Sequence, residues 1–115
     1  MKRLLMVALV LAAGCRGSTI AEEVVVSGRL SLGFETTSFR PCQSTENWLP
    51  VMTPQMHARY DSIAGAMYEP VFARFRGSVG PRGRYGHMGA NDRELYVGEL
   101  LEMRKTAELD CPNTR

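Results

Sequence analysis

Apolar and polar side chains alternate along three stretches of this 115-residue sequence, and that alternation limits the folds open to it. A period of two is typical of a β-strand that buries one face and exposes the other. The first stretch runs from Val24 to Glu35. We expect its buried face to carry Val26, Gly28, Leu30, Leu32 and Phe34.

The second alternating stretch begins after Pro70. One of its faces is formed by Val71, Ala73, Phe75 and Val79, and the other by Phe72, Arg74 and Arg76. The third stretch, Arg93 to Met103, changes phase between its apolar pairs. Such a change indicates a β-bulge, an extra residue in one strand of a pair, and we place it near Gly98.

One helix is expected between the first and second of these strands. Thr53 can cap its first amides, and Pro54 suits the first helical position because its missing N–H leaves no donor unpaired there. Spacings of four, three and four residues then place apolar side chains on one stripe, and the helix should end before Pro70. The stripe consists of Met56, Tyr60, Ile63 and Met67.

Two loops and a short strand complete the expected order of elements. The segment Thr36 to Asn47 is rich in turn-forming residues and contains Cys42, whereas Gly80 to Asn91 is a long, hairpin-like loop. A short strand is expected near Trp48 to Met52. Together these elements predict a mainly β, single-domain fold: a small, OB-like barrel over residues 24–115, with one helix covering an open end.

The residues before Val24 differ in character from the rest. A basic start precedes an apolar run, Leu4 to Ala13, that is too short for a membrane-spanning helix, which needs roughly 20 residues. The run ends in Leu11-Ala-Ala-Gly-Cys15, which resembles the lipobox of bacterial lipoproteins. We expect residues 1–14 to be a lipoprotein signal peptide, Cys15 to carry the lipid (palmitate), and residues 15–23 to be a tether. An ordinary signal peptide, cut near Ala21, is the alternative.

This interpretation also predicts a location and limits the partners. With lipid on Cys15 the membrane is itself a partner, and because Arg16 rather than aspartate follows, a Gram-negative cell would hold the protein at the periplasmic face of the outer membrane. The formal net charge is +2, and Lys2 and Arg3 would leave with the signal peptide, so the mature chain is formally neutral. Nucleic-acid binding needs clustered basic charge, so we expect no nucleic-acid partner, and we expect Arg82-Gly-Arg84 to be a solvated loop.

The cysteines predict a cross-link. Of the three in the chain, Cys15 would carry lipid, which leaves Cys42 and Cys111 as one pair in an oxidising compartment. A structural disulfide is the favoured interpretation. A redox-sensing pair is the alternative.

Several segments together resemble the C-terminal OB domain of NlpE-type envelope lipoproteins. They are Ser38-Phe-Arg-Pro-Cys42, Tyr60, Glu69-Pro-Val-Phe-Ala-Arg-Phe-Arg-Gly77, Arg93-Glu-Leu-Tyr-Val-Gly-Glu99 and Cys111. The resemblance covers roughly Val26 to Cys111 and implies an OB-type barrel, a Cys42–Cys111 disulfide and a role in envelope stress signalling or adhesion. NlpE proteins also have an N-terminal domain with a Cys-x-x-Cys pair, and nothing of that kind precedes Val24. The resemblance therefore implies neither copper binding nor signalling through that domain.

Catalytic and metal-binding patterns are weak. His57 precedes Asp61 by four residues on the expected helix, which favours a surface hydrogen bond or ion pair over catalysis. Two histidines without a paired cysteine motif fall short of a zinc site, and the glycines of Gly77 to Gly89 lack the other residues of a phosphate loop. The methionines could suggest copper(I), but core filling explains them better. We therefore expect no enzyme activity, metal or cofactor.

The remaining candidate binding residues are Trp48, Tyr85 and His87, with core burial as the alternative for Trp48. The first functional hypothesis is a lipid-anchored, non-catalytic module that contacts another envelope protein or reports on envelope stress. The alternative is a periplasmic protein that binds a small ligand or a cell-wall oligosaccharide through its aromatic residues and the Gly80–Asn91 loop.

Overall fold

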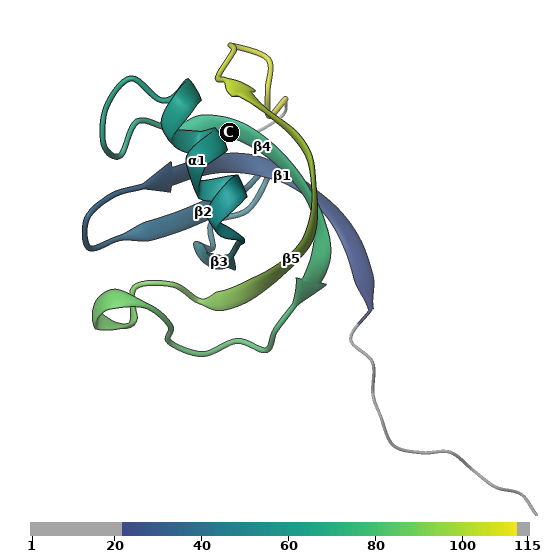
Figure 1. The fold of residues 1–115 in the computed structure, drawn as a ribbon. Helices are drawn as coiled ribbons and strands as arrows, with labels where there is room; N and C mark the ends of the chain where they lie inside the picture. Colours follow the sequence, from purple (N-terminus) through teal and green to yellow (C-terminus); the bar gives the residue numbers. More distant parts are fainter. Residues whose placement is uncertain (1–21, 113–115) are drawn as a thin grey trace, which may run out of the picture.

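The computed structural model describes residues 22–112, and this part forms a closed five-stranded barrel with one α-helix (Figure 1). The strands follow one another around the barrel in the order β1-β2-β3-β5-β4. The β3–β5 pair is parallel and the other pairs are antiparallel. The elements are β1 (Glu23–Leu32), β2 (Thr37–Pro41), β3 (Trp48–Val51), α1 (Pro54–Ile63), β4 (Val71–Val79), a 3-10 turn (His87–Gly89) and β5 (Arg93–Lys105). The mainly β, OB-like barrel expected from the sequence is confirmed.

The barrel interior holds the side chains that the alternation predicted. Leu30, Val71 and Phe75 are fully buried, and Phe39 meets Phe75 edge to face with ring centroids 5.2 Å apart. Tyr60 reaches the same core from α1. Burying side chains of this size contributes about 1.5–3 kcal/mol each, so this cluster is the main source of stability.

Two glycines allow neighbouring strands to approach closely. A Cβ on Gly28 would lie 2.2 Å from the backbone oxygen of Arg40, and one on Gly77 would lie 2.2 Å from the oxygen of Tyr96. Because backbone atoms cannot move aside as a side chain can, these positions require glycine.

The phase change in the third alternating stretch is a pair of bulges. Along the β4–β5 pair the register skips Gly98, as expected, and skips Leu101 as well. Each extra residue increases the local twist, which helps a strand to curve around a small barrel.

Three expectations about burial and extent are wrong. β1 ends at Leu32, so Phe34 lies in a loop with 83% of its surface exposed, and α1 ends at Ile63, so Met67 is 60% exposed. Residues 36–47 contain strand β2 as well as a loop, because Thr37 to Pro41 pair with β1. Phe72 lies on the opposite face of β4 from Val71, as expected, and it is buried there with the Arg104 guanidinium 4.2 Å from its ring centroid.

The end of the chain is tied to the β2–β3 connection. A disulfide joins Cys42 to Cys111 across 69 residues of sequence, with the two Cα atoms 5.1 Å apart. The expected cross-link is thus confirmed. The signal peptide and Cys15 lie outside the described residues, and within residues 22–112 no helix is long and apolar enough to cross a membrane.

Candidate functional site

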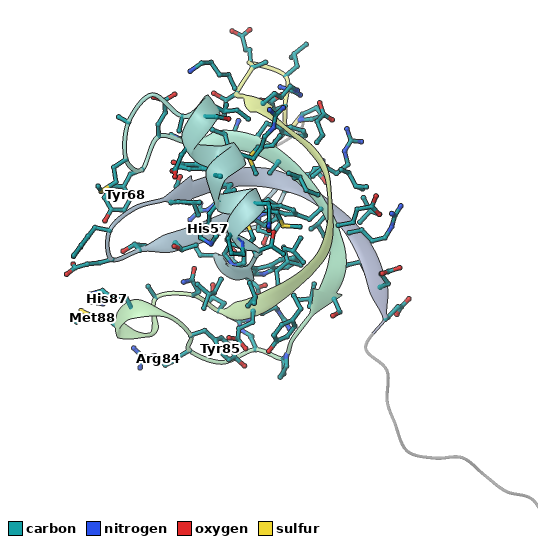
Figure 2. All side chains as sticks on the ribbon, viewed as in Figure 1. His57, Tyr68, Arg84, Tyr85, His87 and Met88 are labelled. Carbon is teal, nitrogen blue, oxygen red and sulfur yellow. A yellow bond between two sulfur atoms is a disulfide. The ribbon has the colours of Figure 1, made fainter. Side chains whose placement is uncertain are left out.

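Three loops lie on one side of the barrel, and we call them the loop face (Figure 2). They are the β1–β2 loop (residues 33–36), the α1–β4 loop (64–70) and the β4–β5 loop (80–92). Figure 2 shows that Tyr68, His87 and Met88, from the second and third of these loops, all point outward on this side.

Tyr68 joins the first two loops. Its amide donates to the carbonyl of Leu32 at 2.9 Å, and its hydroxyl accepts from the amide of Glu35 at 3.3 Å. The ring lies across Gly33, where a Cβ would come within 1.8 Å of Tyr68 Cε1. Tyr68 itself has a positive φ of 67°, a conformation that is uncommon for a bulky residue. The side chain therefore has a specific structural role in this loop.

Asn91 anchors the β4–β5 loop. It is 2% exposed, and its side-chain Nδ2 donates to the carbonyl of Thr37 at 3.2 Å, next to the β1–β2 loop. Its backbone pairs in both directions with Tyr85, and the next residue, Asp92, bonds with Asn47 through both backbone and side chain. Sequence reasoning missed Asn91, because asparagine in a glycine-rich loop usually indicates a turn and not a buried anchor.

Trp48 is half-buried against the core. Its ring centroid lies 6.4 Å from that of Phe39, and its indole N–H donates to the Glu46 carboxylate at 2.8 Å. The same carboxylate pairs with Arg93 at 3.0 Å and with Arg82 at 3.5 Å. The hydrogen bond from Trp48, followed by that from Arg93, holds the pKa of Glu46 below its ordinary value of 4.5. Trp48 is thus partly buried against the core, and Arg82 takes part in an ion pair.

The other two candidate residues lie together in the β4–β5 loop. The Tyr85 hydroxyl donates to the carbonyl of Pro81 at 3.0 Å, so its polar end is already engaged. His87 is exposed, with Nε2 3.9 Å from a carboxylate oxygen of Glu35 in the β1–β2 loop. Met88 beside it is 82% exposed and has a positive φ of 56°.

A cleft of about 460 Å³ opens between α1 and the first two loops. Its apolar walls come mainly from Leu32, Phe34, Tyr60 and Met67, and its two polar lining side chains are His57 and Asp61. No Ser, Thr or Cys lines it, so a Ser–His or Cys–His nucleophile pair is missing from this cleft. The arrangement can bind an apolar group next to a polar or charged one. Sequence reasoning noted the His57–Asp61 spacing but could not place Phe34 and Met67 opposite it.

Metal binding has little support in the described region. Between residues 22 and 112, no three His, Cys, Asp or Glu side chains gather closely enough to hold an ion. The methionines fall into two groups. Met103 is buried and Met52 packs on the core, whereas Met67 and Met88 are exposed.

Comparisons of the chain with models of protein families, with curated proteins and with solved structures find no match.

Proposed function

We propose that this protein is a lipid-anchored envelope lipoprotein whose barrel is a non-catalytic module for contacts with another envelope protein. The observation that carries the proposal is the set of large apolar side chains on the loop face. Phe34, Met67 and Met88 are 83%, 60% and 82% exposed and come from three different loops. Exposed apolar patches of this kind often mark protein interaction sites.

Ordered loops support this function. The hydrogen bonds of Tyr68 and Asn91 fix the loop face to the barrel. A preordered surface loses less conformational entropy when a partner binds, and therefore binds more tightly for the same contacts.

The position of the anchor is also favourable. β1 begins at Glu23, and its ten residues span about 33 Å before the β1–β2 loop begins. Lipid on Cys15 would therefore be tethered to the start of β1, at the far end of this strand from the β1–β2 loop (Figure 1). The loop face would remain accessible to a partner. The NlpE-type resemblance supports the same class of function, with stress signalling or adhesion as the purpose of the contact.

Small-ligand binding is the second candidate function, and the cleft beside α1 is the observation that favours it. Oligosaccharide binding has less support. The indole N–H of Trp48 donates to Glu46 and the hydroxyl of Tyr85 donates to Pro81, so neither group offers its proton to a sugar hydroxyl.

The anchor is tested by mass spectrometry of the native protein, with and without reductant and alkylation. We expect a diacyl or triacyl mass on Cys15 and no alkylation of the other two cysteines before reduction. An unlipidated mass that begins after residue 15 would contradict the anchor.

The interaction is tested by crosslinking and pull-down from the native cell envelope. A Phe34→Ser, Met88→Asn double variant removes two exposed apolar groups, and asparagine tolerates the positive φ of residue 88. Leu109→Ser is the matched control, because Leu109 is 80% exposed but lies on the C-terminal segment. We expect partner recovery to fall about tenfold in the double variant and to stay unchanged in the control. Recovery at background level for the wild type, or equal recovery for all three proteins, would contradict the proposal.

A further inference from the structure

The cleft beside α1 has an apolar interior and an acidic rim. Leu32 and Tyr60 form its inner wall, and the exposed Phe34 and Met67 stand at its edge. Its volume of about 460 Å³ lies within the usual range for ligand sites, roughly 300–1,000 Å³. The space therefore suits one or two large side chains of another molecule.

Asp61 at this cleft is not explained by the stability of the fold. It lies in the last turn of α1, where the helix dipole disfavours a negative charge, and this turn contains no basic residue. Within residues 22–112 Asp61 forms no salt bridge, and it is exposed while it lines the cleft. A carboxylate in this position is available to a cation from outside the chain.

Glu35 adds a second negative charge in the β1–β2 loop beside the cleft. Its only ion-pair partner in the described part of the chain is His87, at 3.9 Å, a distance too long for a hydrogen bond. In contrast, other carboxylates of the barrel, such as Glu46 and Glu102, are paired with arginines. Asp61 in the cleft and Glu35 beside it thus place two carboxylates without an arginine or lysine partner in residues 22–112 on this side of the barrel.

From this arrangement we infer that the cleft binds a peptide segment of the partner in which a large apolar side chain lies next to a lysine or arginine. The apolar side chain enters between Leu32, Tyr60 and Met67, and the cation pairs with Asp61. The His57 imidazole can donate or accept a hydrogen bond to the peptide backbone. This inference rests on the proposed interaction function and identifies the chemistry of its partner.

The binding test uses the purified full chain with ¹³C-labelled methionine methyl groups. Three matched probe peptides carry the central sequences Lys-Leu-Lys-Phe, Glu-Leu-Glu-Phe and Lys-Ser-Lys-Ser, each with acetyl and amide ends. We expect the first peptide to shift the Met67 signal, to leave the buried Met103 signal in place, and to bind at least tenfold more tightly than the other two. Equal affinities, no binding, or a shift confined to other methionines would overturn the inference.

Two variants localise the contact, and each has a matched control. Asp61→Asn should weaken binding of the first peptide up to about fivefold, the usual limit for an exposed ion pair, and Glu108→Gln should not change it. Phe34→Ser should weaken binding about tenfold, and Leu109→Ser should not. Unchanged affinity in both cleft variants would place the site elsewhere and overturn the inference.

The experiments can contradict the peptide inference without contradicting the proposed interaction function. If the envelope pull-down recovers a partner through the loop face but Asp61→Asn has no effect on that recovery, the interaction function stands and the basic, apolar peptide is wrong. A second copy of this chain or an anionic vesicle as the only binding partner would also overturn the inference, because neither provides the stated segment.

Discussion

At the residue scale, Tyr60 in α1 and Tyr68 in the α1–β4 loop have different roles. Tyr60 is buried, and its hydroxyl donates to the carbonyl of Glu69 at 2.6 Å, which closes the return of the chain from α1 to β4. Tyr68 is exposed and holds the β1–β2 loop from outside. The first residue supports the fold and the second shapes the proposed binding surface.

Removing one hydroxyl at a time should separate these roles. Tyr60→Phe leaves a partly buried carbonyl without its donor, and we expect a loss of about 1–2 kcal/mol in the free energy of unfolding. Tyr68→Phe removes a longer, exposed hydrogen bond and should cost less than about 0.5 kcal/mol. Urea unfolding of both variants measures the difference. Equal losses would contradict it.

A second prediction at this scale concerns Glu46. Its pKa is lowered in the folded state, chiefly by Trp48, so the carboxylate stabilises the fold above its unfolded pKa near 4.5. That contribution should disappear as the pH falls through the lower, folded pKa. Wild-type protein should therefore lose more stability than Glu46→Gln between pH 7 and pH 3 in urea unfolding. Glu108→Gln is the charge control, and a wild-type loss equal to that of Glu46→Gln would argue against the assignment.

At the element scale, the curvature of the barrel depends on where neighbouring strands approach and where β5 has extra residues. Gly77 on β4 lies against the backbone of Tyr96 on β5, whereas Gly98, at a bulge, has its nearest neighbouring atom 3.6 Å from an added Cβ. The sequence predicted a bulge near Gly98 but did not indicate the close approach at Gly77. Only the structure shows that one is required by close contact and that the other has space around it.

Alanine substitutions should distinguish the two glycines. Gly77→Ala places a Cβ against the backbone of Tyr96, and we expect a loss of about 3 kcal/mol or more in the free energy of unfolding. Gly98→Ala should change stability by less than about 1 kcal/mol, because it adds no clash and reduces the entropy of the unfolded chain. Thermal or urea unfolding tests this. A tolerated Gly77→Ala would mean that the strands can separate at this point.

At the scale of the whole molecule, the disulfide connects parts of the barrel that no strand pair connects. It joins the turn after β2 to the segment after β5, and Arg104 pairs with Asp110 at 2.7 Å in the same region. The cross-link thus retains the C-terminal segment, which lies beyond the last strand, against the barrel.

Loss of this bond should have a large effect. For a loop of this length, the chain-entropy model gives about 4 kcal/mol, a large share of the roughly 5–15 kcal/mol of a typical domain. We expect the Cys42→Ser, Cys111→Ser double variant to lose about that amount in urea unfolding. Reduced wild-type protein should behave in the same way. A loss below about 1 kcal/mol in both would show that the segment is held by other contacts.

The sequence by itself was sufficient for features that depend on neighbours along one element. Alternation identified the buried faces of β1 and β4, Thr53 and Pro54 marked the start of α1, and the phase change located a bulge at Gly98. The pairing of Cys42 with Cys111, which was expected once Cys15 was set aside as the lipidation site, is present in the structure.

Only the tertiary structure decided the loop face and the cleft. Periodicity reports burial along a strand or helix, but contacts between loops depend on barrel closure, which brings Tyr68 to Gly33 and Asn91 to Thr37. Phe34 and Met67 continued the apolar patterns of their elements, yet both strand and helix end before them. The pattern extends past the element because apolar side chains also serve exposed surfaces, and hydropathy alone does not distinguish a core residue from one that meets a partner.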